Sequence, residues 1–275
     1  MSAPLITFLS DYGYADEFVG VCHGVIAGRC PRARVIDITH AIPAGDVRTG
    51  ALVLADALAY MPAGVHLAVV DPGVGARGPM ARAAVAVRPA RAPQRLLVGP
   101  DNGLLALALE RFGGALEVAE ISASKERLEP LSRTFHGRDI FAPVAAALAA
   151  GAELEDVGDP FAPAALTALE LSRAEYGGGG LVAHVLRADR FGNLVLDATP
   201  AEVEVMTGEG EADVVLVTAG RGHRARTAGA FAEVPRGELL LYEDANGALA
   251  IAVNGGSAAV LLHAGAGAEI LVRPL

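Results

Sequence analysis

LITFLSDYGYADEFVGVCHGVIAG, residues 5–28, contains a predicted strand, a loop and a predicted helix in direct succession. It begins with a short apolar run that ends in a polar residue, as a buried strand does where it meets a loop. From about Glu17 to Gly28 the apolar residues recur at helical spacing, and Pro31 ends the pattern. We expect this order of elements to decide the fold of the first half of the chain.

The same alternation recurs further along the chain. Apolar runs of strand type lie at 34–38, 65–71, 95–101 and 115–121, and helical patterns follow most of them. Strands that alternate with helices predict a mostly parallel sheet flanked by helices on both faces. The N-terminal part is therefore expected to be an α/β domain.

A second region begins near a run of glycines, YGGGG at 176–180, which indicates a flexible break. The segments that follow, such as NLVLDA, DVVLVTA and LAIAVN, are short apolar runs separated by Gly and Asn turns. Short strands at this spacing predict a small all-β sandwich or barrel. We expect an N-terminal domain of residues 1–175 and a C-terminal domain of residues 176–275.

The composition argues against several classes of partner. The formal net charge is -10, from 32 acidic and 22 basic residues, and no basic stripe with interleaved aromatic residues occurs, so nucleic acid is not expected. No apolar stretch approaches the roughly 20 residues that cross a bilayer, and the first residues lack a secretory pattern. We therefore expect a soluble, cytoplasmic protein without a membrane partner. Cys22 and Cys30 would lie roughly 12 Å apart on the predicted helix, beyond disulfide reach.

Aspartates lie at the ends of four predicted strands: Asp11, Asp37, Asp71 and Asp101. Ligands of open α/β sheets bind at the carboxyl ends of the strands, so this pattern indicates a binding edge. The alternative for each residue is a turn or a helix cap, because Asp is common in both places. Asp16 has the same alternative, as the cap of the helix that begins at Glu17.

Two further motifs carry polar groups in turns. In VVDPGVGARG, residues 69–78, the Pro-Gly turn ends the strand and presents Asp71 at its tip. In TFHGRDIFAP, residues 134–143, Asp139 is well placed to cap the helix that follows. The local sequence alone favours the interpretation of His136 as a polar residue of that turn.

A metal site is not expected. Asp11, Asp71, Asp101 and His136 could in principle surround a divalent ion, but the sequence contains no HxH or HExxH spacing and no acids at fixed short intervals.

Seven motifs occur in order across both halves: FLSDYGYADEFVG, HAIPAGDVRTGA, VVDPGVG, GPDNG, TFHGRDIFAP, ADRFGN and IAVNGGSAA. Together they resemble the S-adenosyl-L-methionine (SAM) hydroxide adenosyltransferase family, the SAM hydrolases related to the fluorinase and chlorinase enzymes. The resemblance implies an N-terminal α/β domain, a C-terminal β-barrel and a homotrimer that binds SAM between subunits.

The activity that the resemblance implies is hydrolysis of SAM to adenosine and L-methionine by water or hydroxide at C5′ of the ribose. The family uses an Asp, an Arg and a His, which correspond here to Asp71, an arginine and His136. Arg77 is expected to be the arginine because it lies near the tip of the Asp71 turn; Arg82, directly before the next strand, is the alternative. His136 thus becomes an expected catalytic group instead of a turn residue.

The resemblance also assigns the contacts to SAM. It gives the ribose diol to Asp11, the methionine end to Asp16 and Asp189, the adenosyl group to Phe191 and Asn193, and the adenine to Phe231, Asn254 and Gly255. The chain departs from the fluorinase pattern at Gly45, where a tryptophan is absent, and at Ala245 and Asn246, which replace a Ser-Arg pair. The second change leaves the contact to the methionine carboxylate unassigned.

No cofactor is expected, because SAM is the substrate and carries its own leaving group. Two alternatives remain: a halogenase that makes 5′-halo-5′-deoxyadenosine, and a SAM- or adenosine-binding protein without turnover. His136 argues against the halogenase, because the halogenases have small residues at this position.

Overall fold

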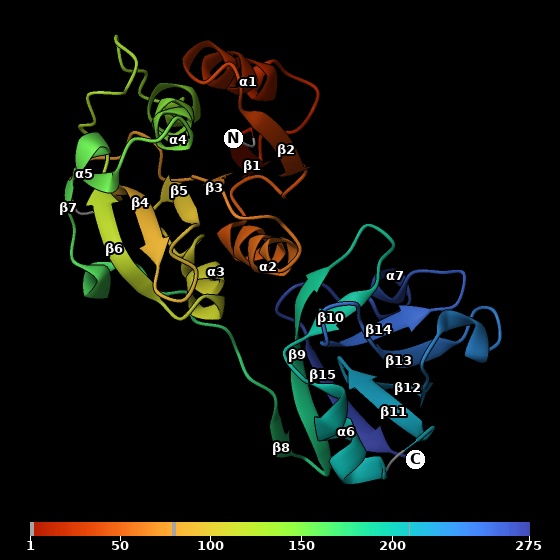
Figure 1. The fold of residues 1–275 in the computed structure, drawn as a ribbon. Helices are drawn as coiled ribbons and strands as arrows, with labels where there is room; N and C mark the ends of the chain where they lie inside the picture. The colour runs from red at the N-terminus through yellow and green to blue at the C-terminus, as the bar shows by residue number, and fades with distance from the viewer. Residues whose placement is uncertain (1–2, 79–80, 209) are drawn as a thin grey trace. The chain divides into compact units, whose positions relative to one another are not determined.

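The computed structural model describes residues 3–78, 81–208 and 210–275, which form two compact units, Met1–Leu169 and Glu170–Leu275 (Figure 1). The structure thus places the boundary a few residues before the expected one. The reason is that the chain joins the second unit before it reaches the glycine run, with the Ala174 amide donating to the carbonyl of Asp197 at 3.4 Å. The glycine run itself is a hairpin turn, because Gly177 and Gly180 pair across it.

The N-terminal unit contains a seven-stranded sheet in the order β2-β1-β3-β5-β4-β6-β7. Its strands are β1 (Leu5–Ser10), β2 (Arg34–Thr39), β3 (Val65–Val69), β4 (Ala84–Pro89), β5 (Leu96–Pro100), β6 (Ala115–Glu120) and β7 (Asp159–Pro160). Strands β2, β1, β3 and β5 are parallel neighbours, whereas β4 is antiparallel to both β5 and β6. The predicted α/β class is confirmed.

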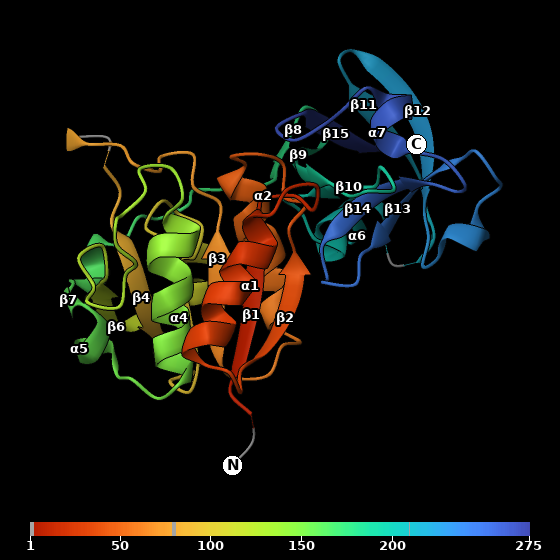
Figure 2. The same ribbon diagram turned by 90° about the horizontal axis from the view of Figure 1, so that it is seen from above.

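Helices cover both faces of this sheet (Figure 1), and Figure 2 looks onto the face that two of them cover. They are α1 (Phe18–Arg29), α2 (Val47–Leu58), α3 (Ala106–Arg111), α4 (Ala142–Ala149) and α5 (Leu154–Val157), with short turns η2 (Gly137–Phe141) and η3 (Pro163–Ala165). One core cluster joins α1 and α4 to the sheet, and another joins α2 and α3 to the opposite face. The alternation of strand side chains decides the faces, since Ile6 and Phe8 belong to the first cluster and Leu9 to the second.

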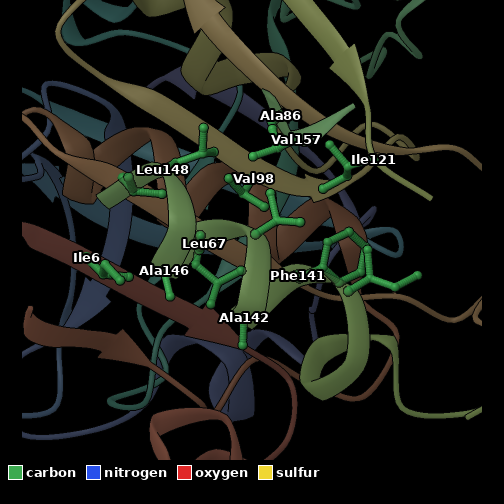
Figure 3. Packing of buried hydrophobic residues seen from close by; sticks show 14 of the residues in the cluster. Ile6, Leu67, Ala86, Val98, Ile121, Phe141, Ala142, Ala146, Leu148 and Val157 are labelled. Carbon is green, nitrogen blue, oxygen red and sulfur yellow. The ribbon is translucent and has the colours of Figure 1, made fainter. Parts of the chain in front are cut away.

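Small side chains on α4 hold this helix close to the sheet (Figure 3). Ala142 and Ala146 are fully buried and pack in the same cluster as Ile6 and Leu67 of the strands. A helix with alanines on its buried face can approach a sheet closely without leaving voids. The residues directly before α4 are thereby fixed against the sheet edge.

The C-terminal unit is a closed barrel of seven strands in the order β10-β14-β13-β12-β11-β15-β9, closed by pairing of β10 with β9, and β8 extends it beside β9. The strands are β8 (Glu175–Gly177), β9 (Gly180–Ala188), β10 (Leu194–Leu196), β11 (Asp213–Thr218), β12 (Arg221–Thr227), β13 (Leu239–Glu243), β14 (Leu249–Val253) and β15 (Glu269–Pro274). Helices α6 (Pro200–Thr207) and α7 (Ala258–Leu262) and the turn η4 (Phe231–Glu233) complete it. The sequence did not distinguish a sandwich from a barrel. The pairing of β10 with β9, which closes the sheet, makes it a barrel.

Within the described ranges, no helix has the length and apolar character that a bilayer crossing requires.

Candidate active site

Asp71 and Arg82 form the central ion pair of the N-terminal unit. Arg82 Nε lies 3.1 Å from both carboxylate oxygens of Asp71, and Arg82 Nη2 also donates to Asp71 Oδ2. The two side chains are only 6% and 10% exposed, so water screens the pair weakly. The Arg82 guanidinium also lies 5.3 Å from the ring centre of the buried Phe141, which helps to fix its plane.

His136 joins this pair through Arg82. Arg82 Nη2 lies 3.0 Å from His136 Nδ1. A guanidinium can only donate, so Nδ1 must accept, and the proton of the neutral imidazole is on Nε2. The three side chains thus form a connected chain from carboxylate to guanidinium to imidazole.

The sheet topology explains why Arg82 meets Asp71. Asp71 follows the carboxyl end of β3, and Arg82 precedes β4, which runs antiparallel to β5. The start of an antiparallel strand lies at the same edge as the ends of its parallel neighbours. Arg82 therefore returns to the edge that Asp71 occupies.

Arg77, the arginine that we expected from the sequence, is not the partner of Asp71. It lies exposed on the loop after the turn. The amide of Val74 donates to the carbonyl of Asp71, and the amide of Ala76 donates to the carbonyl of Gly73. These hydrogen bonds close the turn before the chain reaches Arg77. The turn separates Arg77 from Asp71, whereas the sheet brings Arg82 back to it. The role of Arg77 in catalysis stays a prediction.

Two glycines allow the surrounding loops to approach one another. Gly75 has φ +71°, and a Cβ at this position would overlap the carbonyl oxygen of Arg133, in the segment that leads to His136. A Cβ on Gly137 would likewise overlap the hydroxyl of Tyr12, from the loop after β1. The loops that carry Asp71 and His136 therefore pack at backbone distance.

The electrostatic surroundings favour a neutral imidazole. Burial lowers the pKa of His136, and the positive charge of Arg82 lowers it further, while Asp71, Asp139 and a hydrogen bond to the Ser132 backbone oppose this shift. Burial also raises the pKa of Tyr12 well above its usual value, so its hydroxyl stays protonated. Sequence reasoning missed Tyr12, although it lies in the quoted first loop between Asp11 and Gly13.

Asp139 does not cap the helix as we expected. It lies inside the π-helical turn η2, which begins at Gly137 and continues into α4. Its buried carboxylate accepts from the Ser132 amide at 2.7 Å and pairs with Arg138. Asp139 therefore stabilises the loop before His136 instead of the first turn of a helix.

The other strand-end aspartates each have partners of their own. Asp11 accepts from the Gly45 amide at 2.8 Å, and Asp101 accepts from the Thr167 amide at 2.8 Å. Asp37 lies within β2 and contacts two histidines. Asp16 is exposed, and Glu17, not Asp16, holds the N-cap position of α1. The edge therefore carries several separate polar groups instead of one carboxylate cluster.

The C-terminal unit contains a cavity of about 710 Å³ that gathers most of the binding residues expected there. Its lining includes five of them: Asp189, Phe191, Asn193, Phe231 and Gly255. Asn254, the sixth, is not part of that lining; it precedes Gly255 and donates to the carbonyl of Val234 at 2.8 Å. Aromatic and polar groups in a cavity of this size fit a small molecule.

Asp189 shapes one wall of this cavity. Its Oδ1 accepts from the amides of Phe191 and Asn193 at 2.8 and 2.9 Å, and its Oδ2 accepts from Asn193 Nδ2 at 2.8 Å. The carboxylate thereby folds the loop that presents the Phe191 ring, which is 67% exposed. On another wall the ring of Phe231 packs against Tyr242, with 5.1 Å between centres.

Sequence reasoning missed three residues that line the same cavity: Arg187, Tyr242 and Asp244. Arg187 lies on β9 two residues before Asp189, so its place beside a predicted binding residue was the available signal. Ala245 and Asn246, the departures from the fluorinase pattern, also line the cavity. Arg187 therefore puts a cation in the cavity where the Ser-Arg pair is lacking.

Comparisons with known proteins identify the family of this chain. The model of the SAM hydroxide adenosyltransferase N-terminal domain matches residues 6–158, and that of the C-terminal domain matches residues 183–271. The chain is 46% identical to an (R)-S-adenosyl-L-methionine hydrolase of Salinispora arenicola over 98% of both chains. It is 28% identical to a fluorinase of Nocardia brasiliensis over 98% of this chain and 97% of that one.

A solved structure has the same fold throughout. The crystal structure of an uncharacterized conserved protein from Thermotoga maritima aligns with a TM-score of 0.87 and 35% identity, covering 97% of this chain and 99% of that one. The domain matches span both units, and the identity to the hydrolase far exceeds that to the fluorinase. The chain belongs to the SAM hydroxide adenosyltransferase family.

Proposed function

We propose that this protein hydrolyses SAM to adenosine and L-methionine, with water or hydroxide attacking C5′ of the ribose. The observation that carries the proposal is the connected set Asp71, Arg82 and His136 at the sheet edge of a chain in this family. The name of the Salinispora arenicola relative gives the same reaction class.

The chemistry suits this set of residues. The new C5′–O bond takes its electron pair from water, the C5′–S bond breaks with its pair going to sulfur, and methionine leaves as a neutral thioether. No acid is needed for the leaving group, whereas the attacking water must lose a proton. Water has a pKa near 15.7, so charges that favour hydroxide character are the main contribution that the protein can make.

The tautomer of His136 supports a role as donor to the attacking oxygen. Because Nδ1 accepts from Arg82, the Nε2–H can donate to the attacking oxygen and, with the Arg82 charge, stabilise its developing negative charge. Asp71 holds Arg82 through three hydrogen bonds, from Nε and Nη2, or accepts the proton as hydroxide forms. Alignment of the oxygen with C5′ contributes further to the rate enhancement, since effective molarities of well-oriented groups reach about 10⁵ M or more.

The substrate contacts in the proposal follow the family assignment: Asp11 for the ribose, Asp16 and Asp189 for the methionine end, Phe191 and Asn193 for the adenosyl group, and Phe231, Asn254 and Gly255 for the adenine. Arg187 adds a cation for the methionine carboxylate. The proposal includes no cofactor, a homotrimer with sites at subunit interfaces, and a cytoplasmic location. Sedimentation analysis tests the trimer.

Incubation with SAM and separation of the products by chromatography tests the activity. Hydrolysis gives adenosine and methionine in equal amounts, with and without chloride or fluoride. A halo-nucleoside would instead identify a halogenase, and unchanged SAM would identify a binding protein. Both sulfonium epimers belong in the assay, because the relative's name specifies the R form.

A further inference from the structure

A second group of chemically active side chains lies beside the first loop of the N-terminal unit. His23 of α1, Asp37 of β2 and His40, which follows β2, each offer one ligand atom, and these atoms lie within 4.8 Å of one another. His23 Nε2 is 2.9 Å and His40 Nε2 is 3.1 Å from the same oxygen, Asp37 Oδ1. None of the three belongs to the proposed hydrolytic set. We propose that His23, Asp37 and His40 form a binding site for one divalent transition-metal ion.

The spacing of the ligand atoms fits such an ion. Imidazole and carboxylate ligands lie about 2.1 Å from Zn²⁺, so neighbouring ligands are about 3.0 Å apart in octahedral and about 3.4 Å apart in tetrahedral geometry. The two nitrogen–oxygen distances fall at the octahedral value. Two imidazoles with one carboxylate suit Zn²⁺, Co²⁺, Ni²⁺ or Fe²⁺, and not the oxygen-seeking Mg²⁺.

His40 provides the second, independent observation. Its side chain is fully buried, and Nε2 lies 3.1 Å from Asp37 Oδ1 but does not meet the geometry of a hydrogen bond to any described residue. Buried polar atoms are normally paired, so this nitrogen is unusual. A lone pair on Nε2 that faces Asp37 Oδ1 is repelled by it, unless Nε2 carries a proton or one cation binds both atoms.

The other nitrogen of His40 is held as metal-binding histidines are held. His40 Nδ1 lies 2.7 Å from Ser10 Oγ, which already accepts from the Tyr12 amide. With Nδ1–H donating to Ser10 Oγ, the lone pair of Nε2 points to Asp37, and the serine acts as the oxygen partner that fixes the tautomer.

Access to the site is open on one side. His23 and Asp37 are 35% and 34% exposed, so an ion can enter from solvent and keep water in its remaining positions. The ion would connect α1, β2 and the loop after β1, because the Gly13 amide donates to the His40 carbonyl at 2.7 Å. Asp11 lies in that loop, so the ion would stiffen a loop that the proposed function uses.

Metal content measured on untagged protein tests the proposal. Protein stripped with EDTA is dialysed against Zn²⁺ or Co²⁺, and bound metal is counted by mass spectrometry and by the visible absorption of Co²⁺. We expect one ion per chain and no comparable uptake of Mg²⁺. Since even partners of metal ligands change affinity by about 10- to 100-fold, His23→Gln and Asp37→Asn should each weaken binding at least tenfold.

The C-terminal unit supplies a matched control. His184 Nδ1 lies 2.9 Å from Asp197 Oδ2, a histidine–aspartate contact of the same length, and His184→Gln should leave Zn²⁺ binding unchanged. Both tested positions are partly exposed, and circular dichroism checks that each variant folds. A wild-type protein that takes up no Zn²⁺, or variants that bind it as tightly as wild type, would overturn the proposal. The readout is independent of SAM turnover, so the two proposals fail separately.

Discussion

Arg82 binds the carboxylate of Asp71, although it lies eleven residues further along the chain. Its Nε is 3.1 Å from each carboxylate oxygen. The same guanidinium donates to His136 Nδ1 at 3.0 Å. Arg82 is therefore the residue that connects the other two, and its loss should separate them.

Arg82→Ala should lower kcat for SAM hydrolysis by about 10²- to 10³-fold, as removal of a donor to a developing oxyanion does. Arg77→Ala is the matched control and should stay within about twofold of wild type, because Arg77 is exposed on the loop. Steady-state assays of adenosine release check both. The reverse pattern, with Arg77 essential and Arg82 dispensable, would reinstate the expectation from the sequence.

The neutral state of His136 predicts an acid-tolerant reaction. Its pKa lies below the usual 6.5, through burial and the Arg82 charge, so the imidazole stays neutral as the pH falls through 6.5. We expect kcat/KM to keep its plateau below pH 6.5 and to fall only when His136 is protonated. NMR titration of the histidine resonances, assigned with His136→Gln, measures the pKa directly. A His136 midpoint at or above 6.5 would contradict this account.

His66 predicts a pH-dependent stability that is separate from catalysis. It is fully buried, accepts from Arg95 at 2.9 Å and contacts Thr7 at 2.9 Å; burial, then the Arg95 charge, lowers its pKa to about 3. A lowered pKa in the folded state means that its stabilising effect is complete above pH 6.5 and is lost as the pH falls towards 3. The expected loss is about 4 to 5 kcal/mol of unfolding free energy.

Urea unfolding between pH 6.5 and 3 measures that loss. The variant His66→Gln cannot be protonated in this range, so its stability should fall less steeply than that of the wild type. Equal slopes for the two proteins would show that carboxylates alone cause the decrease.

A side chain at position 75 should destabilise the protein, because Gly75 lies against the backbone of another loop at the candidate active site. Gly75→Ala places a Cβ against the Arg133 carbonyl at φ +71°, so backbone strain and overlap add to about 2 to 5 kcal/mol of lost stability. Gly114→Ala has a similar φ of +88° with nothing within 4 Å of the added Cβ, and should cost only about 1 to 2 kcal/mol. Thermal or urea unfolding compares them, and equal losses would remove the close approach from the explanation.

Replacement of Phe191 should weaken SAM binding without lowering the stability of the fold. Its ring is 67% exposed in the cavity, so Phe191→Ala should leave stability within about 0.5 kcal/mol of wild type. Loss of stacking on a base, worth about 1 to 3 kcal/mol, should raise KM for SAM by about 5- to 160-fold. Val205→Ala, at a position 76% exposed on α6, is the control that should leave KM unchanged. An unchanged KM in Phe191→Ala would place the adenosyl group elsewhere.

The sequence by itself determined the class of both units and most of the candidate residues. The alternation of strands and helices has local causes, namely side-chain periodicity and turn residues, and these can be read along the chain. The motifs around Asp71 and His136 identified two members of the proposed catalytic set, and the ADRFGN motif identified the Asp189 loop of the cavity.

Only the tertiary structure decided which arginine completes that set, what Asp139 does and where Asp37 points. Each depends on contacts between segments far apart in sequence: antiparallel β4 returns Arg82 to Asp71, and α1 brings His23 to Asp37. The closure of the C-terminal strands into a barrel depends in the same way on β10 pairing with both β9 and β14. Strand order and direction arise from the packing of the whole sheet, so the local pattern of apolar and polar residues does not predict them.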